Sequence, residues 1–231
     1  MLIPPPPTVT PPGYGYVLLT NDPADATVTL NGFLADGATF SQAAPIGEDD
    51  TIAVYPIAYS GSLSGVLWGK LTLSPAPATP TPTGNLTWIR KGPSSGMFEA
   101  GFPNDPLTVE GSPWSNSVPL DTIIVTNSQF TVVGAGVNTS VACYVSPTNH
   151  TNIVSNTKIA GFKSATVNTN TGQLTLLFTN TGNVHVTGGG ALLQTPYAIG
   201  STTNIGGGFF TMPSSGASPT NAGSILLSPP Q

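Results

Sequence analysis

Charge is what this chain has least of. Only 6% of its 231 residues are charged, against roughly a quarter in an ordinary soluble domain. The five Lys and Arg residues form no cluster, so they do not provide the basic stripe that a nucleic acid or an anionic membrane surface would require. The polar surface must come from Thr, Ser, Asn and Gly instead. Such a surface is common in secreted β proteins, adhesins and packed assemblies.

Cysteine and long apolar runs are scarce too. Cys143 is the only cysteine, so an intrachain disulfide is excluded. It alternates with Val141 and Val145, which predicts a small, buried, apolar side chain. No segment approaches the ~20 apolar residues of a membrane helix, so we expect no membrane insertion. The first residues do not have the pattern of a signal peptide.

Proline is abundant at the start of the chain. Residues 1–13 hold six prolines and are predicted to form an extended, polyproline-rich lead. An isolated lead of this kind would be disordered. We therefore expect a neighbouring subunit to hold it, through Pro4, Pro5, Pro6 and Pro7.

The rest of the chain carries strand signals. Residues 14–91 form a first β half, 92–119 a Gly-, Pro- and Ser-rich irregular connection, and 120–231 a second β half that begins with a strand near 121–126. The sequence shows no sustained helical periodicity. About a dozen short strands predict an all-β fold, an antiparallel barrel or a barrel-like β-sandwich, built as one domain or two tightly packed subdomains. Segments 27–40 and 173–186 echo each other, which suggests an internal duplication.

Catalytic patterns are incomplete. Residues 92–96 match G-x-S-x-G, but a nucleophile elbow needs a following helix, and Gly101, Pro103 and Pro106 interrupt that stretch. His150 and His185 are the only imidazole bases, and no spacing selects a pair of carboxylates. We therefore expect no enzyme and no cofactor.

Acidic residues in predicted turns make one metal, calcium, a candidate ligand. Asp22, Asp25, Asp49 and Asp50 could converge on calcium, which takes loop oxygens as ligands, although no EF-hand pattern is present. The alternative is ordinary turn chemistry.

Aromatic rings are the best candidates for binding. Trp114 lies in the irregular region and is expected to be the most exposed tryptophan. Tyr55 and Tyr59 could join it in a platform for sugars. Trp68 and Trp88 fall inside strand patterns and are predicted to be core residues.

Several strings, taken in order, carry a family resemblance: Gly32 to Ile46, Gly65 to Gly69, Leu86 to Lys91, Phe98 to Phe102, Val109 to Ser112, Gly190 to Gln194 and Gly207 to Phe210. The chain resembles a β domain near the C-terminus of large secreted proteins of Verrucomicrobia and related bacteria, which often carry immunoglobulin-like or Calx-β repeats. The resemblance covers about residues 14–228. It implies export, a cell-surface setting and a non-enzymatic role.

Two functions follow as hypotheses. The first is a structural or adhesive surface module that assembles with itself, as in a filament or layer, or with other surface proteins. The alternative is a carbohydrate-binding module that holds glycans on exposed aromatic rings.

Overall fold

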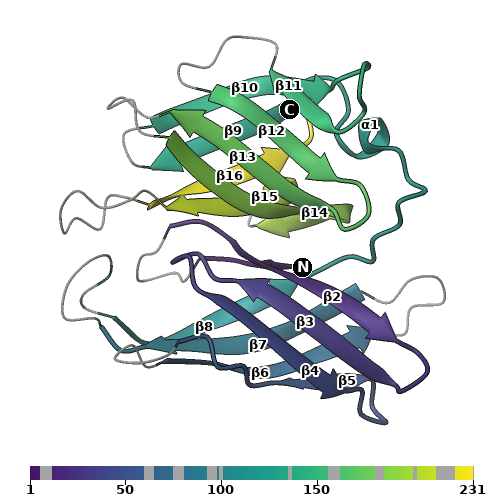
Figure 1. The fold of residues 1–231 in the computed structure, drawn as a ribbon, viewed down its shortest axis with the longest axis vertical. Coiled ribbons are helices and arrows are strands. Elements are labelled where there is room, and N and C mark those ends of the chain that lie inside the picture. The colour runs from purple at the N-terminus through teal and green to yellow at the C-terminus, as the bar shows by residue number, and fades with distance from the viewer. Residues whose placement is uncertain are drawn as a thin grey trace.

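Two eight-stranded antiparallel sheets make up the protein (Figure 1). The structure is a computed structural model that describes residues 1–5, 12–59, 65–74, 81–92, 98, 101–134, 137–155, 162–179, 185–199, 202–211 and 222–230. The first sheet is a nearly closed barrel and the second is a closed barrel. The all-β prediction is confirmed, and barrels are found rather than a sandwich. The sixteen strands exceed the predicted dozen.

The first barrel contains β1 (Leu2–Ile3), β2 (Gly15–Asp22), β3 (Thr27–Phe33), β4 (Thr39–Pro45), β5 (Thr51–Val54), β6 (Gly65–Ser74), β7 (Thr81–Arg90) and β8 (Phe102–Glu110). The second contains β9 (Ser128–Gly134), β10 (Val137–Val145), β11 (Asn152–Ser155), β12 (Phe162–Asn168), β13 (Gln173–Thr179), β14 (His185–Ile199), β15 (Thr202–Thr211) and β16 (Ala222–Ser228). The short helix α1 (Leu120–Ile123) lies in the segment that joins the barrels.

Both barrels share one topology. In each, the strands follow one another around the barrel in chain order, with the last strand beside the first. The echoing segments 27–40 and 173–186 do not take equivalent places, because the first spans the third and fourth strands of its barrel and the second spans the fifth and sixth. A duplication of a whole barrel would not produce that particular echo. The duplication itself stays a prediction.

Alternating burial builds the cores. In β3, Val28 and Leu30 point inward while Thr29 and Asn31 are exposed, as the two-residue period of a strand requires. Side chains fill the interior of an eight-stranded barrel, and the large buried ones here include Trp88 in the first barrel and Phe130 and Phe210 in the second. Cys143 is fully buried in the second core, and burial raises the pKa of its thiol to about 12, so the prediction for this residue is confirmed.

The first barrel has two seams where the ladder of strand pairing is not continuous. Between β4 and β5, which do not pair, the side chain of Gln42 on β4 bonds to the backbone of β5 and of the residue after it. Its Nε2 donates to Ala53 O and its Oε1 accepts from Tyr55 N, each at 2.8 Å. Between β2 and β8, the two-residue strand β1 pairs with both neighbours. The second barrel, in contrast, is closed by strand pairing alone.

A third apolar cluster joins the two barrels. Tyr14 and Tyr16 of the first barrel segment pack with Phe209 and Leu193 of the second. Tyr14 N donates to Gly208 O at 3.0 Å, and a β-carbon added at Gly207 would lie 3.0 Å from the Tyr14 ring. Glycine at position 207 is therefore needed for the close approach.

Three parts of the predicted organisation differ from the structure. Residues 121–126 were expected as a strand, but Leu120 and Ile124, four residues apart, both bury into the second core from one turn of helix. The expected irregular connection 92–119 contains β8, which pairs with β7 along its length, with Pro106 opposite Thr87, and with β1 at Glu110. The proline-rich lead 1–13 begins with a buried strand, β1, and its residues 6–11 lie outside the described ranges.

None of the helices in the described ranges has the length and apolarity needed to cross a membrane.

Candidate functional site

The three aromatic residues predicted to form a platform do not come together. Tyr55 is 69% exposed, as expected. Tyr59 is buried in the first core instead. Trp114 is half-buried against the second core, and its Nε1 donates to Thr169 O at 2.8 Å, because Gly172 leaves room for the indole beside it. The expected exposure of the Tyr59 ring was therefore wrong, and Trp114 is less exposed than Trp68.

A different pair of rings is exposed on one face. Trp68, predicted to be a core residue, is 48% exposed on β6. The pairing of β5 with β6 ends with Val54 opposite Gly69, and Tyr55 and Trp68 are the next residue of each chain segment beyond that pair. Residues opposite each other in an antiparallel pair project from the same face. Ile57, two residues after Tyr55, is 81% exposed.

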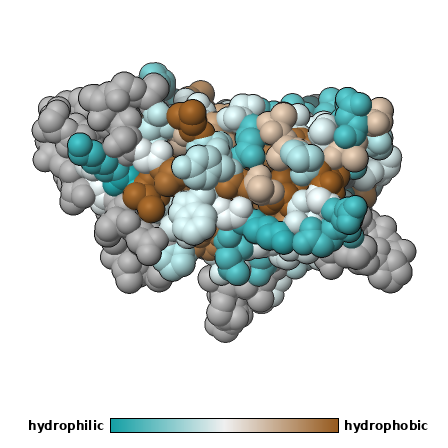
Figure 2. Space-filling view, turned by 90° about the horizontal axis from the view of Figure 1, so that it is seen from below, coloured by the Kyte–Doolittle hydropathy of each residue, from teal (hydrophilic) through white to brown (hydrophobic). Residues whose placement is uncertain are grey.

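This outward face points away from the second barrel. Figure 2 looks onto that side of the first barrel and shows apolar and near-neutral side chains gathered over its middle, with hydrophilic ones towards the rims. Val66 and Ile89, which pair across β6 and β7, are half-buried beside the exposed rings. We call Tyr55, Ile57 and Trp68 the aromatic face.

Local backbone features position the aromatic face. Gly69 has a φ of 154°, and a β-carbon there would lie 2.3 Å from Asn85 O, so only glycine fits next to Trp68. The Gln42 side chain holds the amide of Tyr55 at 2.8 Å. The backbone beside Trp68 is therefore held by close packing at Gly69, and the backbone of Tyr55 is held by the hydrogen bond to Gln42.

An ion pair lies at the polar rim of the aromatic face. Lys70, exposed on β6, donates from Nζ to Asp49 Oδ2 at 2.8 Å. Hydrogen bonds from Lys70 and from the Thr51 hydroxyl lower the pKa of Asp49 to about 2. One positive and one negative charge therefore offset each other at the edge of the face.

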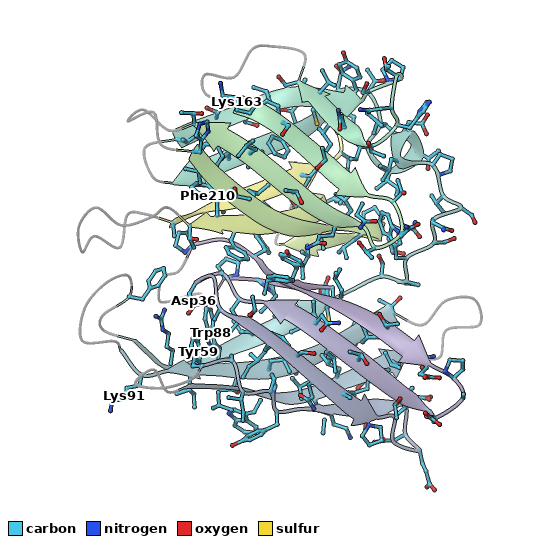
Figure 3. The ribbon with its side chains drawn as sticks, in the orientation of Figure 1. Asp36, Tyr59, Trp88, Lys91, Lys163 and Phe210 are labelled. Atoms are coloured by element: carbon cyan, nitrogen blue, oxygen red, sulfur yellow. The ribbon has the colours of Figure 1, made fainter. Side chains whose placement is uncertain are left out.

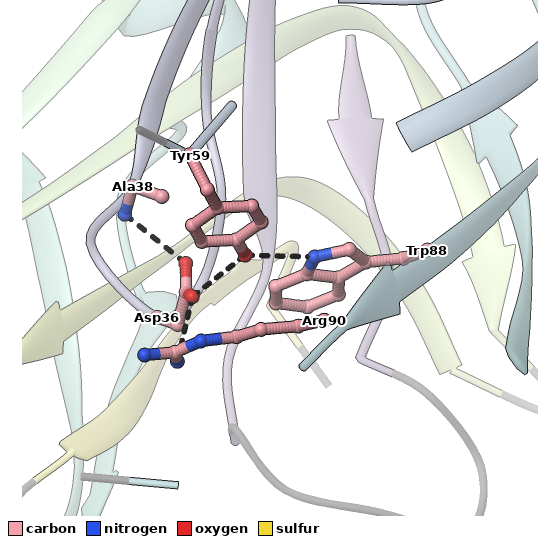
Figure 4. Close-up of polar contacts among 5 residues, drawn as sticks. All are labelled: Asp36, Ala38, Tyr59, Trp88 and Arg90. Carbon is pink, nitrogen blue, oxygen red and sulfur yellow. Dashed lines mark hydrogen bonds and ion pairs between the residues drawn. The ribbon is translucent and has the colours of Figure 1, made fainter. Parts of the chain in front are cut away.

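A buried polar network lies at one end of the first barrel, where Figure 3 places Asp36, Tyr59 and Trp88 together. Asp36 Oδ2 accepts from Tyr59 OH at 2.8 Å and lies 2.8 Å from Arg90 Nη1, and Trp88 Nε1 donates to Tyr59 OH at 2.9 Å (Figure 4). Asp36 Oδ1 also accepts from Ala38 N at 3.0 Å. Burial raises the pKa of Asp36 and outweighs the opposing effects of these partners.

The network is structural in character. The guanidinium of Arg90 also lies over the rings of Tyr59 and Phe98, at 5.5 and 5.7 Å from their centres. All these side chains are buried, so the network ties the β3–β4 hairpin to β7 below the surface. The Asp36–Gly37 turn signal located the hairpin, but nothing in the sequence pattern marked Arg90 as the partner of Asp36.

The four aspartates considered for calcium fall in two turns. Asp22 is the last residue of β2 and Asp25 lies in the β2–β3 turn, where Asp22 Oδ1 accepts from Ala24 N. Asp49 and Asp50 lie in the β4–β5 turn, where Asp49 is engaged by Lys70. Across the described residues, no three acidic, His or Cys side chains gather to hold a metal ion. The described residues therefore form no cluster of the kind that binds calcium.

The catalytic candidates are not brought together in what is described. Ser94 lies outside the described residues. His150 occupies a turn with a φ of 53°, and His185 is exposed at the start of β14. Both histidines belong to the second barrel, so neither geometry nor spacing supports an acid–base pair with an acid of the first.

Comparison of the chain with protein-family models, with curated proteins and with solved structures finds no match. The resemblance to a verrucomicrobial surface domain therefore stays a prediction.

Proposed function

We propose that this chain is a non-catalytic adhesive module of a cell surface, and that it binds a neutral polysaccharide on the aromatic face. The observation that carries the proposal is the exposure of Tyr55, which directly follows β5, and of Trp68 on the neighbouring strand β6, at 69% and 48%. Large exposed apolar side chains that cluster on one face mark interaction sites.

The chemistry of the face favours sugars. Tyr and Trp combine an apolar ring with a polar group, which suits ligands that have an apolar face and a ring of hydroxyls. Hydroxyl and amide groups for hydrogen bonding lie on the same outward side of β7, at Asn85 and Thr87. Lys70 and Asp49 pair with each other at this rim, so neither of these two charges is left over to select an ionic ligand.

The extracellular setting is part of the proposal. A chain with 6% charged residues has a surface built from Thr, Ser, Asn and Gly, which is common among adhesins. The resemblance to secreted bacterial β domains supports the same setting. A role for the chain as a self-assembling subunit depends on strand β1, at a separate place in the first barrel.

A binding measurement tests the proposal. Purified chain is tested for retention on insoluble and soluble neutral polysaccharides, and affinity is measured for any that bind. Trp68→Ala and Tyr55→Ala are each expected to weaken binding about tenfold, which corresponds to about 1.4 kcal/mol per ring contact. Tyr144→Ala, a half-buried tyrosine on β10 of the second barrel, is the matched control and should bind like the unsubstituted chain.

Two outcomes would contradict the proposal. One is the absence of binding to every neutral polysaccharide in the panel. The other is binding that Trp68→Ala and Tyr55→Ala leave unchanged while Tyr144→Ala weakens it, since the ligand would then lie on the second barrel.

A further inference from the structure

Strand β1 is a short insertion that completes the first barrel. Leu2 pairs with Tyr16 of β2 on one side and with Glu110 of β8 on the other. Met1 adds two bonds to β2: its amino group donates to Val17 O at 3.1 Å, and Val17 N donates to Met1 O at 3.0 Å. Among the described strands, β1 is all that connects β2 to β8.

The three inserted side chains reach both barrels. Met1 and Ile3 point into the core of the first barrel, and Leu2 points to the cluster shared with the second. All three are at most 7% exposed. The space between β2 and β8 fits these side chains closely. A β-carbon at Gly111, for example, would lie 3.1 Å from the Met1 β-carbon. Without this segment, β2 and β8 would each expose an unpaired edge, the kind of edge to which another strand adds.

The connector to β2 is poorly suited to turning back. Ile3 and Gly15 are register partners, so their Cα atoms lie about 5 Å apart. Between them are eleven residues, 4–14, and six of the first nine are proline. In polyproline II a segment of this length spans about 30 Å, and proline fixes φ at values that resist chain reversal. The second end is also held, because Tyr14 N donates to Gly208 O.

From these observations we propose that the N-terminal strand is exchanged between copies of this chain. Residues 1–3 of one copy insert between β2 and β8 of a second copy and make the same pairings there that they make within one chain. Because the contacts are equal in the two arrangements, the connector decides between them, and a connector whose six prolines disfavour chain reversal favours exchange. The inference is independent of the proposed glycan binding, which uses the opposite side of the first barrel.

Single-cysteine chains test the exchange directly. In a Cys143→Ala background, one chain carries Leu2→Cys and the other Glu110→Cys. Register partners have a Cα separation that a disulfide can bridge. The two chains are mixed, unfolded in denaturant, refolded together and oxidised. Exchange places the cysteine at position 2 of one chain opposite the cysteine at position 110 of the other, so a disulfide-linked heterodimer is expected. Insertion within one chain would leave each cysteine without a partner, because each chain carries only one.

Two controls accompany this experiment. Leu2→Cys is mixed in the same way with Val133→Cys, an exposed position of the second barrel that is not a partner of β1, and little cross-linking is expected. In the second control, glycine and serine replace the six prolines of residues 4–12. The flexible connector lets residues 1–3 insert into their own chain. The yield of heterodimer should then fall about tenfold, which corresponds to about 1.4 kcal/mol in favour of the single-chain arrangement.

The mass of the unsubstituted chain provides a readout that does not depend on a substituted β1. Light scattering after refolding should show dimers or longer assemblies whose fraction rises with protein concentration. A mass of one chain up to about 1 mM, the effective concentration of a short linker, overturns the proposal. So does a heterodimer yield no higher than that of the Val133→Cys mixture, or one that the proline replacements leave unchanged.

Discussion

The buried pair of Asp36 and Arg90 provides a test in which the two partners should respond differently. The carboxylate and guanidinium lie 2.8 Å apart, with their side chains 1% and 9% exposed. Asp36→Asn keeps an acceptor for Ala38 N but removes the negative charge beside Arg90. Arg90→Met keeps the length of the side chain and removes the positive charge. Breaking one partner of a buried ion pair costs about 3–5 kcal/mol, a large part of a domain's stability.

The pH dependence separates the two variants. An isolated buried carboxylate can take up a proton and become neutral, whereas a guanidinium stays charged at every accessible pH. Burial already raises the pKa of Asp36, so the folded state binds this proton more tightly than the unfolded state does. Stability linked to Asp36 therefore increases as pH falls through the folded pKa towards the ordinary value of 3.8. Loss of Arg90 raises the pKa of Asp36 in the folded state further. This widens the pH range over which the folded state binds the extra proton.

Urea unfolding followed by tryptophan fluorescence measures both effects, because Trp88 belongs to the network. We expect Arg90→Met to regain stability by up to about 1.4 kcal/mol per pH unit as the pH falls through the folded pKa of Asp36 towards 3.8. Asp36→Asn has no proton to bind and should stay destabilised over the same range. Equal pH profiles for the two variants, or a cost below about 1 kcal/mol for Asp36→Asn at pH 7, would refute the reasoning.

Three further perturbations follow from the fold. Gln42→Ala removes both bonds that bridge the β4–β5 seam and should cost about 1–2 kcal/mol, with faster hydrogen exchange at the Tyr55 amide and no such change in Gln129→Ala on the second barrel. Gly207→Val should separate the barrels, seen as a larger radius of gyration in X-ray scattering while both barrels stay folded. Burial lowers the pKa of the Met1 amino group to about 5, so the free energy of unfolding of the 231-residue chain should fall by up to about 4 kcal/mol from pH 8 to pH 5, and acetylation of that group should remove this dependence.

Local sequence patterns predicted the elements whose pairing partners are close in the chain. The alternation at Val28 and Leu30 marked β3, and the Asp36–Gly37 signal marked the turn, where Gly37 has a φ of 90° and its amide donates to Leu34 O. Such signals depend on neighbours within a few residues. Closure into two barrels depends on pairings such as β16 with β9, across most of the second half, and no local pattern encodes them.

The candidate site was harder to predict because a strand's period does not say which face is the core. On β6, Val66 and Trp68 form one apolar row and Leu67 and Leu71 the other. Either row could have been buried, and tertiary packing selected the leucines. Trp114 shows the reverse case, in which an irregular segment buries its indole because a distant glycine admits it.

The strand-exchange proposal rests on the incomplete closure of the first barrel. A barrel whose strands pair all the way round has no free edge, and the second barrel is of this kind. The first barrel instead uses a glutamine side chain at one seam and a three-residue chain segment at the other. A side chain or a short segment can open at a lower free energy than a full ladder. Hydrogen exchange should therefore be faster at the amides of both seams than along the β16–β9 ladder. Equal protection at all three places would mean that the seams are as closed as the second barrel, and would remove the physical basis for strand exchange.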